Sequence, residues 1–171
     1  AQDFAPEGAL SGQPGRIGES IDLNGAADAL RSYANDIVKR PPSGGVTVSF
    51  WIKTMSTQNG GEFVYSNAGA NFMRYHNGDL KPVFDGSTGG ATTFNVNIND
   101  GGWHHVAAVH NGAGTTSLYV DGDLAGTQSE SLEDAGSFGR QTAIGSAYDD
   151  TGENVNASFD DFAVWERALG P

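Results

Sequence analysis

The chain closes with Ser158-Phe159-Asp160-Asp161-Phe162-Ala163-Val164-Trp165-Glu166-Arg167-Ala168-Leu169, an alternating apolar stretch that opens on two adjacent carboxylates. Successive side chains of a strand point to opposite faces of the sheet. We therefore expect Asp160 to share a face with Phe162 and Val164, at the margin of the core, and Asp161 to face outward. A carboxylate at such a margin is costly unless it is hydrogen-bonded, paired or bound to a metal. The stretch predicts a closing β-strand with a cation site near its start.

The composition is that of a β protein with many turns. The 171 residues include 25 Gly, 9 Phe, 5 Tyr and 3 Trp, and no heptad or long helical period is visible. Asn-Gly and Asp-Gly pairs, which tolerate the positive φ of tight hairpin turns, separate the apolar segments. The strands expected from this pattern cover residues 16–23, 29–33, 46–54, 62–65, 72–76, 80–85, 92–98, 103–110, 115–121, 124–128, 141–144 and 157–165. About a dozen short strands without intervening helices predict an all-β, two-sheet antiparallel sandwich.

Charge and residue usage exclude several classes of partner. The formal net charge is −12, from 21 acidic and 9 basic residues, which argues against nucleic acid and anionic membranes. No apolar run approaches the length needed to span a bilayer, and the absence of cysteine excludes disulfides and thiolate metal sites. We expect residues 1–171 to form one domain, a monomeric module of a larger chain, because the sequence starts at Ala-Gln-Asp without Met.

Four segments, in order, resemble the laminin G-like domains of the concanavalin A-like lectin/glucanase superfamily. They are Ser20–Gly25 followed by Asp28, the strand Val46–Thr54, the pair Trp103–Ala107 and Leu118–Gly122, and the terminal Phe159–Leu169. The resemblance implies a jelly-roll of two curved sheets whose first and last strands are adjacent. It also implies that such modules frequently carry one calcium ion at the rim, and that they include sugar-binding modules, adhesion domains and enzyme accessories.

The predicted calcium ligands are Asn24, Asp28 and Asp160. If the strand ending at Leu23 lies antiparallel to a closing strand that starts near Phe159, the loop after Leu23 meets Asp160 at one rim. Calcium takes six to eight oxygen ligands, and carboxylates, amides and backbone carbonyls supply them. An Asx turn at Asn24 and a solvated Asp160 would explain the residues equally well, and the family resemblance favours calcium.

The loop that enters the closing strand is the predicted ligand-binding surface. It offers an aromatic ring, three carboxylates and an amide, from Tyr148, Asp149, Asp150, Glu153 and Asn154. Sugars stack on aromatic rings and form hydrogen bonds with carboxylates and amides. A solvated acidic loop is the alternative.

The aromatic and histidine residues are assigned to packing. Trp51 is expected on the second face of its strand, Trp103 in or beside the core, and Trp165 partly exposed. We expect His105 to be a partly buried hydrogen-bonding residue and His104 a surface residue. None of the three tryptophans is predicted to be a platform for sugar.

The sequence therefore predicts an extracellular, calcium-containing module that recognises carbohydrate or cell-surface glycan within an adhesin or a glycan-degrading protein. A structural spacer stabilised by calcium is the first alternative. A glycoside hydrolase is the second, but the Glu-x-Asp-x-x-Glu pattern of hydrolytic relatives is missing and Asp160 and Asp161 are expected on opposite faces. We expect no enzymatic activity.

Overall fold

The computed structural model describes residues 5–7, 12–25, 28–32, 44–56, 62–67, 71–76, 79–84, 94–131, 142–146 and 153–170. These residues form strands and no helix. In chain order the strands are β1 (Ala5–Glu7), β2 (Gly12–Pro14), β3 (Glu19–Asn24), β4 (Ala29–Ser32), β5 (Val46–Lys53), β6 (Glu62–Asn67), β7 (Asn71–His76), β8 (Asp79–Val83), β9 (Trp103–His110), β10 (Thr115–Val120), β11 (Asp123–Ser129), β12 (Thr142–Ile144) and β13 (Asn156–Trp165).

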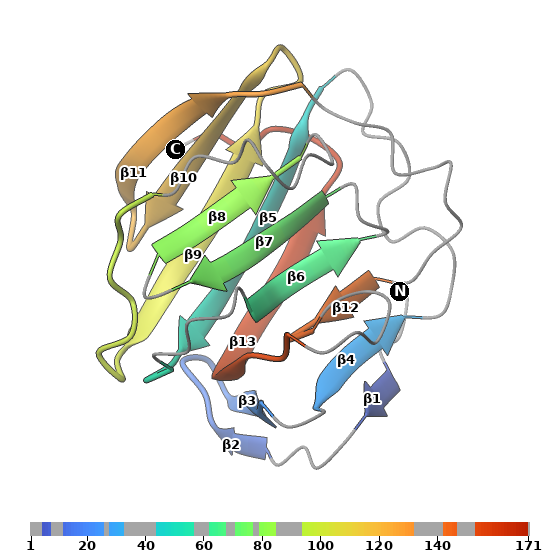
Figure 1. Cartoon of the computed structure of the whole chain (residues 1–171), viewed down its shortest axis with the longest axis vertical. Coiled ribbons are helices and arrows are strands. Elements are labelled where there is room, and N and C mark those ends of the chain that lie inside the picture. The colour runs from blue at the N-terminus through green and yellow to red at the C-terminus, as the bar shows by residue number, and fades with distance from the viewer. Residues whose placement is uncertain are drawn as a thin grey trace.

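The strands form two antiparallel sheets. One has the order β1-β4-β12-β6-β7-β8, and the other has the order β11-β10-β9-β5-β13-β3-β2. Figure 1 shows the six-stranded sheet in front of the seven-stranded one. The closing strand β13 lies between β5 and β3, so the last strand is hydrogen-bonded to one of the first. The predicted all-β jelly-roll sandwich is confirmed.

The core lies between the sheets and follows the alternation of the strands. In β5 the inward side chains Val46, Val48, Phe50 and Ile52 are all buried. Phe50 contacts the ring of Phe159 edge-on at 5.9 Å between centroids. Each such side chain contributes about 1.5–3 kcal/mol by leaving water. The inward residues of β5 and β13 therefore fix which side chains remain on the outer face.

The strand pattern differs from the prediction at residues 94–98 and at β1 and β2, which were not predicted. Residues 94–98 form no strand, and Phe94 makes only an isolated bridge to Leu80. The short strand β2 contains Gly12 and Pro14, which lower strand propensity, but it lies at the edge of its sheet, where proline is tolerated. No helix long and apolar enough to cross a membrane occurs in the described ranges.

Candidate functional site on the outer face of the seven-stranded sheet

A β-bulge in β13 separates the two adjacent aspartates from the strand that follows them. Asp160 pairs with Trp51 of β5, and Ala163 pairs with Ser49. Two residues of β13, Asp161 and Phe162, therefore lie opposite one residue of β5, Phe50. Asp161 adopts a φ of 47°, in the left-handed region. The extra residue shifts the alternation of β13 by one position.

The bulge places Asp160 on the outer face. Phe159, one position before it, lies in the core, and Phe162 and Val164, beyond the bulge, pack against the core as well. The prediction that Asp160 shares a face with Phe162 and Val164 is therefore wrong, because it assumed an unbroken alternation through Asp161.

Asp160 is nevertheless buried, with 8% of its surface exposed, because the turn between β2 and β3 covers it. Its Oδ2 accepts a hydrogen bond from the backbone N–H of Ile17 at 2.8 Å, and its Oδ1 accepts one from Asp161 at 2.8 Å. A Cβ atom at Gly15 would lie 2.5 Å from Asp160 Oδ2, so only glycine fits there. The carboxylate thus holds the turn against the sheet.

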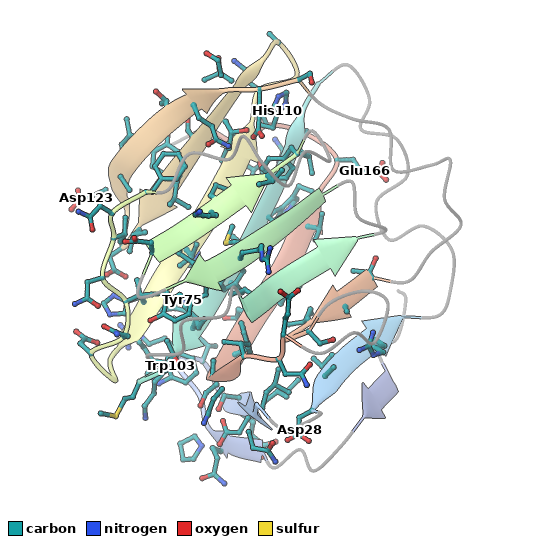
Figure 2. The ribbon with its side chains drawn as sticks, in the orientation of Figure 1. Asp28, Tyr75, Trp103, His110, Asp123 and Glu166 are labelled. Atoms are coloured by element: carbon teal, nitrogen blue, oxygen red, sulfur yellow. The ribbon has the colours of Figure 1, made fainter. Side chains whose placement is uncertain are left out.

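The other two predicted calcium ligands lie at the rim, away from Asp160. Asn24 pairs with Asn156, four residues before Asp160 in β13, which corresponds to about 13 Å along the strand. Asp28 is 3% exposed, and its Oδ2 accepts the backbone N–H of Asn24 at 3.2 Å. Figure 2 shows Asp28 at one end of the sandwich, beside β3 and β4. The structure brings Asn24 and Asp28 together and separates both from Asp160.

The predicted ligand-binding loop is only partly described. Its members are Tyr148, Asp149, Asp150, Glu153 and Asn154, and the first three lie outside the described residues. Glu153 is exposed and forms an ion pair with Arg74 of β7. Asn154 is partly buried. Glu153 is therefore directed at the six-stranded sheet rather than at Asp160.

A floor of small residues crosses the outer face of the seven-stranded sheet. Ala163 of β13, Ser49 of β5 and Ala107 of β9 are cross-strand neighbours, and the row ends at Tyr119 of β10. Because these side chains are short, the backbone beneath them is closer to the surface than in the neighbouring rows. Ser49, Ala107 and Tyr119 of this row line a groove.

Aromatic side chains lie in the rows next to these small residues. On one side Trp51 pairs with His105, and their ring centroids are 5.2 Å apart. On the other side Trp165 pairs with Thr47. Trp165, Tyr119 and His105, all partly buried, line the groove, whose volume is about 310 Å³. The sheet register, rather than any local motif, assembles these rings.

The C-terminal segment closes one end of the groove. Thr47 Oγ1 donates to the carbonyl of Arg167 at 2.9 Å and accepts the N–H of Leu169 at 3.0 Å. Leu169 and Gly170 line the groove beside Trp165. Thr47 is consequently buried although it faces outward.

Arg16 belongs to the turn above Asp160 and lies over the ring of Trp51. Its guanidinium carbon is 5.1 Å from the centre of the Trp51 ring, a cation–π distance. Arg16 is exposed and forms no ion pair with any residue in the described ranges. It adds a hydrogen-bond donor to an aromatic surface.

His105 is partly buried, as predicted, and His104, which was expected at the surface, is partly buried as well. Trp103 and His105 lie on the outer face, whereas His104 lies on the opposite face, between two carboxylates. His104 Nδ1 is 2.7 Å from Asp121 Oδ2, and Nε2 is 3.1 Å from Asp100 Oδ1. Partial burial of the ring lowers the pKa of His104, but the two hydrogen bonds outweigh it and the net pKa is raised.

Trp51 lies on the second face of its strand, as predicted, and Trp165 is partly exposed, as predicted. Trp103, expected in or beside the core, is partly buried and shares the outer face with His105. The groove itself was missed. The small outward residues of β5, β9 and β13 could have indicated the groove, but only if the register of the three strands had been known.

The two antiparallel sheets, with β13 between β5 and β3, define a jelly-roll sandwich of the concanavalin A-like type. The sequence profile of the concanavalin A-like lectin/glucanases superfamily matches residues 24–171, and the chain belongs to this superfamily. No curated protein matches the sequence.

Among solved structures, the chain is similar to the binding domain of Paraclostridial Mosquitocidal Protein 1, with a TM-score of 0.77 and 17% identity over 99% of this chain and 45% of the other. It is similar to domain 4 of AbnA, a GH43 extracellular arabinanase from Geobacillus stearothermophilus in complex with arabinotriose, with a TM-score of 0.73 and 18% identity over 96% and 78%. It is also similar to the receptor binding domain of a botulinum neurotoxin C/D mosaic serotype, with a TM-score of 0.71 and 16% identity over 99% and 44%.

The chain spans less than half of the two toxin domains and most of the arabinanase domain. At these identities the similarity establishes the fold alone.

Proposed function

We propose that this chain is a carbohydrate-binding module and that the groove lined by Trp165, Tyr119 and His105 holds the sugar. The observation that carries the proposal is the row of small residues with aromatic side chains beside it. A sugar ring presents apolar C–H groups on its faces and hydroxyls on its edge, so it stacks on aromatic rings while its edge forms hydrogen bonds. Ser49 and His105 supply polar groups beside the rings.

The similar structures are consistent with this role. The AbnA domain was solved with arabinotriose, and the other two are binding domains of toxins. We infer that the chain works outside the cell, as part of an adhesin or a glycan-degrading protein, because AbnA is described as an extracellular arabinanase. The module is proposed to bind glycan without cleaving it.

Binding in the groove is tested with a glycan array and matched variants of Trp165. Trp165→Ala should lose at least tenfold in affinity for the array hits, because a stacked aromatic contributes about 0.5–1.5 kcal/mol beyond its buried area. Trp165→Phe should retain most of the affinity. Lys81→Ala, on the other sheet, is the control. An array that stays blank with folded protein would favour the spacer, and shortened polysaccharide after incubation would reveal an enzyme.

Calcium remains part of the proposal, with a changed set of ligands. Asn24, Asp28 and Asp160 do not fit one ion, because the register separates Asp160 from the rim. No group of three Asp, Glu or His side chains able to hold a metal occurs in the described ranges. We retain Asp160, because each of its oxygens accepts one backbone hydrogen bond and a carboxylate oxygen has two lone pairs.

If calcium binds at Asp160, EDTA should lower the melting temperature of the wild type by several degrees, because removal of a ligand that binds only the folded state destabilises it. Asp160→Asn should reduce this difference, and Asp28→Asn should leave it. Identical melting curves in calcium and in EDTA would eliminate the ion from the proposal.

A further inference from the structure

A second hollow lies at the end of the same outer face, where β3, β5 and β13 reach the rim. Its volume is about 560 Å³, and its lining includes Asp22, Ser158, Lys53 and the exposed Met55. It does not include Asp160 or the aromatic residues of the groove. We call it the rim pocket.

The register places three unlike polar groups in one row across the rim pocket. Asp22 of β3 pairs with Ser158 of β13, and Ser158 pairs with Lys53 of β5. Neighbouring strands are about 4.8 Å apart, so the Cα atoms of Asp22 and Lys53 are about 10 Å apart with a hydroxyl between them. From β3 across β13 to β5, the row offers a hydrogen-bond acceptor, a hydroxyl and a hydrogen-bond donor.

Neither charged end of the row has a partner among the described residues. Asp22 Oδ1 is buried and accepts no hydrogen bond, which costs free energy unless a donor reaches it. Rotation about the last side-chain bond of aspartate is soft and can exchange its oxygens. Lys53 is exposed and forms no ion pair within these ranges. The two charges stand on either side of an open volume instead of neutralising each other.

The rim pocket and the groove lie over outward side chains of one strand, with Trp51 and Arg16 between them. Thr47 and Ser49 line the groove, Trp51 follows, and Lys53 lines the rim pocket. Thr47 and Lys53 are six residues apart, about 20 Å along the strand. The two hollows therefore lie on one track along β5.

We propose that the rim pocket is a second saccharide subsite and that the ligand is an oligosaccharide lying along β5 from the groove to the rim. This inference rests on the proposed function of the groove. A sugar hydroxyl both donates and accepts, so one sugar at the rim can donate to Asp22 and accept from Lys53. Met55, 76% exposed, supplies an apolar contact for the ring.

The experiment is titration calorimetry with the best hit of a glycan array, prepared as a series from one to eight sugar residues. Affinity should rise at least tenfold when the ligand becomes long enough to reach the rim. Asp22→Asn and Lys53→Gln should each reduce the affinity for the long ligand by about tenfold or more, because each removes a hydrogen bond to a charged group. Neither should change the affinity for the shortest ligand that binds.

The matched controls are Asp79→Asn and Lys81→Gln on β8 of the other sheet, which should leave every affinity unchanged. If affinity does not depend on length, or if Asp22→Asn and Lys53→Gln bind the long ligand like the wild type while Trp165→Ala does not, the rim subsite is refuted and the groove stands. If no glycan binds, both proposals fail.

Discussion

Asp160 and Asp22 lie on the outer face of adjacent strands, and they differ in what covers them. Asp160 is buried under the turn between β2 and β3, and both of its oxygens accept backbone hydrogen bonds. Asp22 pairs across the strands with Ser158, two positions before Asp160, and one of its oxygens is buried without a partner. The carboxylate of Asp160 holds the turn in place, and the carboxylate of Asp22, with an unsatisfied oxygen beside a pocket, is available to a sugar.

Among the substitutions that test this contrast, Asp160→Ala is expected to lower the free energy of unfolding most. Removing the carboxylate leaves the N–H groups of Ile17 and Asp161 without their acceptor, and the cavity adds to the cost. We expect a loss of about 3 kcal/mol in the free energy of unfolding, measured by urea titration. Asp160→Asn keeps one acceptor oxygen and should lose less. A change below about 0.5 kcal/mol for the alanine variant would show that the turn does not depend on Asp160.

The fold was predictable from the sequence because the apolar alternation of β5, β9 and β13 is strong. Trp103–His110 was predicted with both of its bounds, and β5 within one residue. The cross-strand register was not predictable to the same degree. It depends on which residues oppose one another, and that is decided by packing of both sheets at once.

The bulge explains why the face of Asp160 was wrong. Phe159 and Phe162 both face the core although they are three positions apart, which an unbroken strand does not permit. The sequence contains this shift in the alternation of inward and outward residues. It is hard to recognise because either of the two adjacent aspartates can be assigned as the outward residue. Asp22 faces outward in β3, and its unpaired oxygen could not be foreseen without coordinates.

Asp161 allows the bulge itself to be tested. Its φ of 47° is unfavourable for side chains branched at Cβ and is easy for glycine. Asp161→Val should lower the free energy of unfolding by about 1–2 kcal/mol. Asp161→Gly should equal or exceed the wild type. Equal stability of the valine and glycine variants would mean that the left-handed conformation is not required.

A smaller effect on stability, which depends on pH, is expected from His104, the shared partner of Asp100 and Asp121. Because its pKa is raised in the folded state, the protonated ring stabilises the fold fully below the unfolded pKa of about 6.5, and this stabilisation is lost as the pH rises through the folded pKa. The loss should be below about 1 kcal/mol, since the carboxylates of Asp100 and Asp121 are largely exposed. Urea titrations at pH 5.5 and pH 9 should show it, in the range where the carboxylates stay ionised.

His104→Gln is the control for that measurement, because glutamine keeps hydrogen-bonding groups without a titrating ring. The difference between its stabilities at the two pH values should be smaller than in the wild type. If both proteins respond to pH equally, the ion pairs of His104 with Asp100 and Asp121 do not contribute.

The smallest change in stability is expected from Asp22→Asn, and the contrast with Asp160 depends on it. Asp22 Oδ1 has no hydrogen bond to lose, and replacing the charge by an amide removes part of the desolvation cost of the buried oxygen. The free energy of unfolding should stay within about 0.5 kcal/mol of the wild type or rise. A loss comparable to that of Asp160→Ala would show that Asp22 also holds structure. In that case, a fall in affinity for glycan in the same variant would no longer locate a subsite at the rim, and Lys53→Gln would have to carry that test.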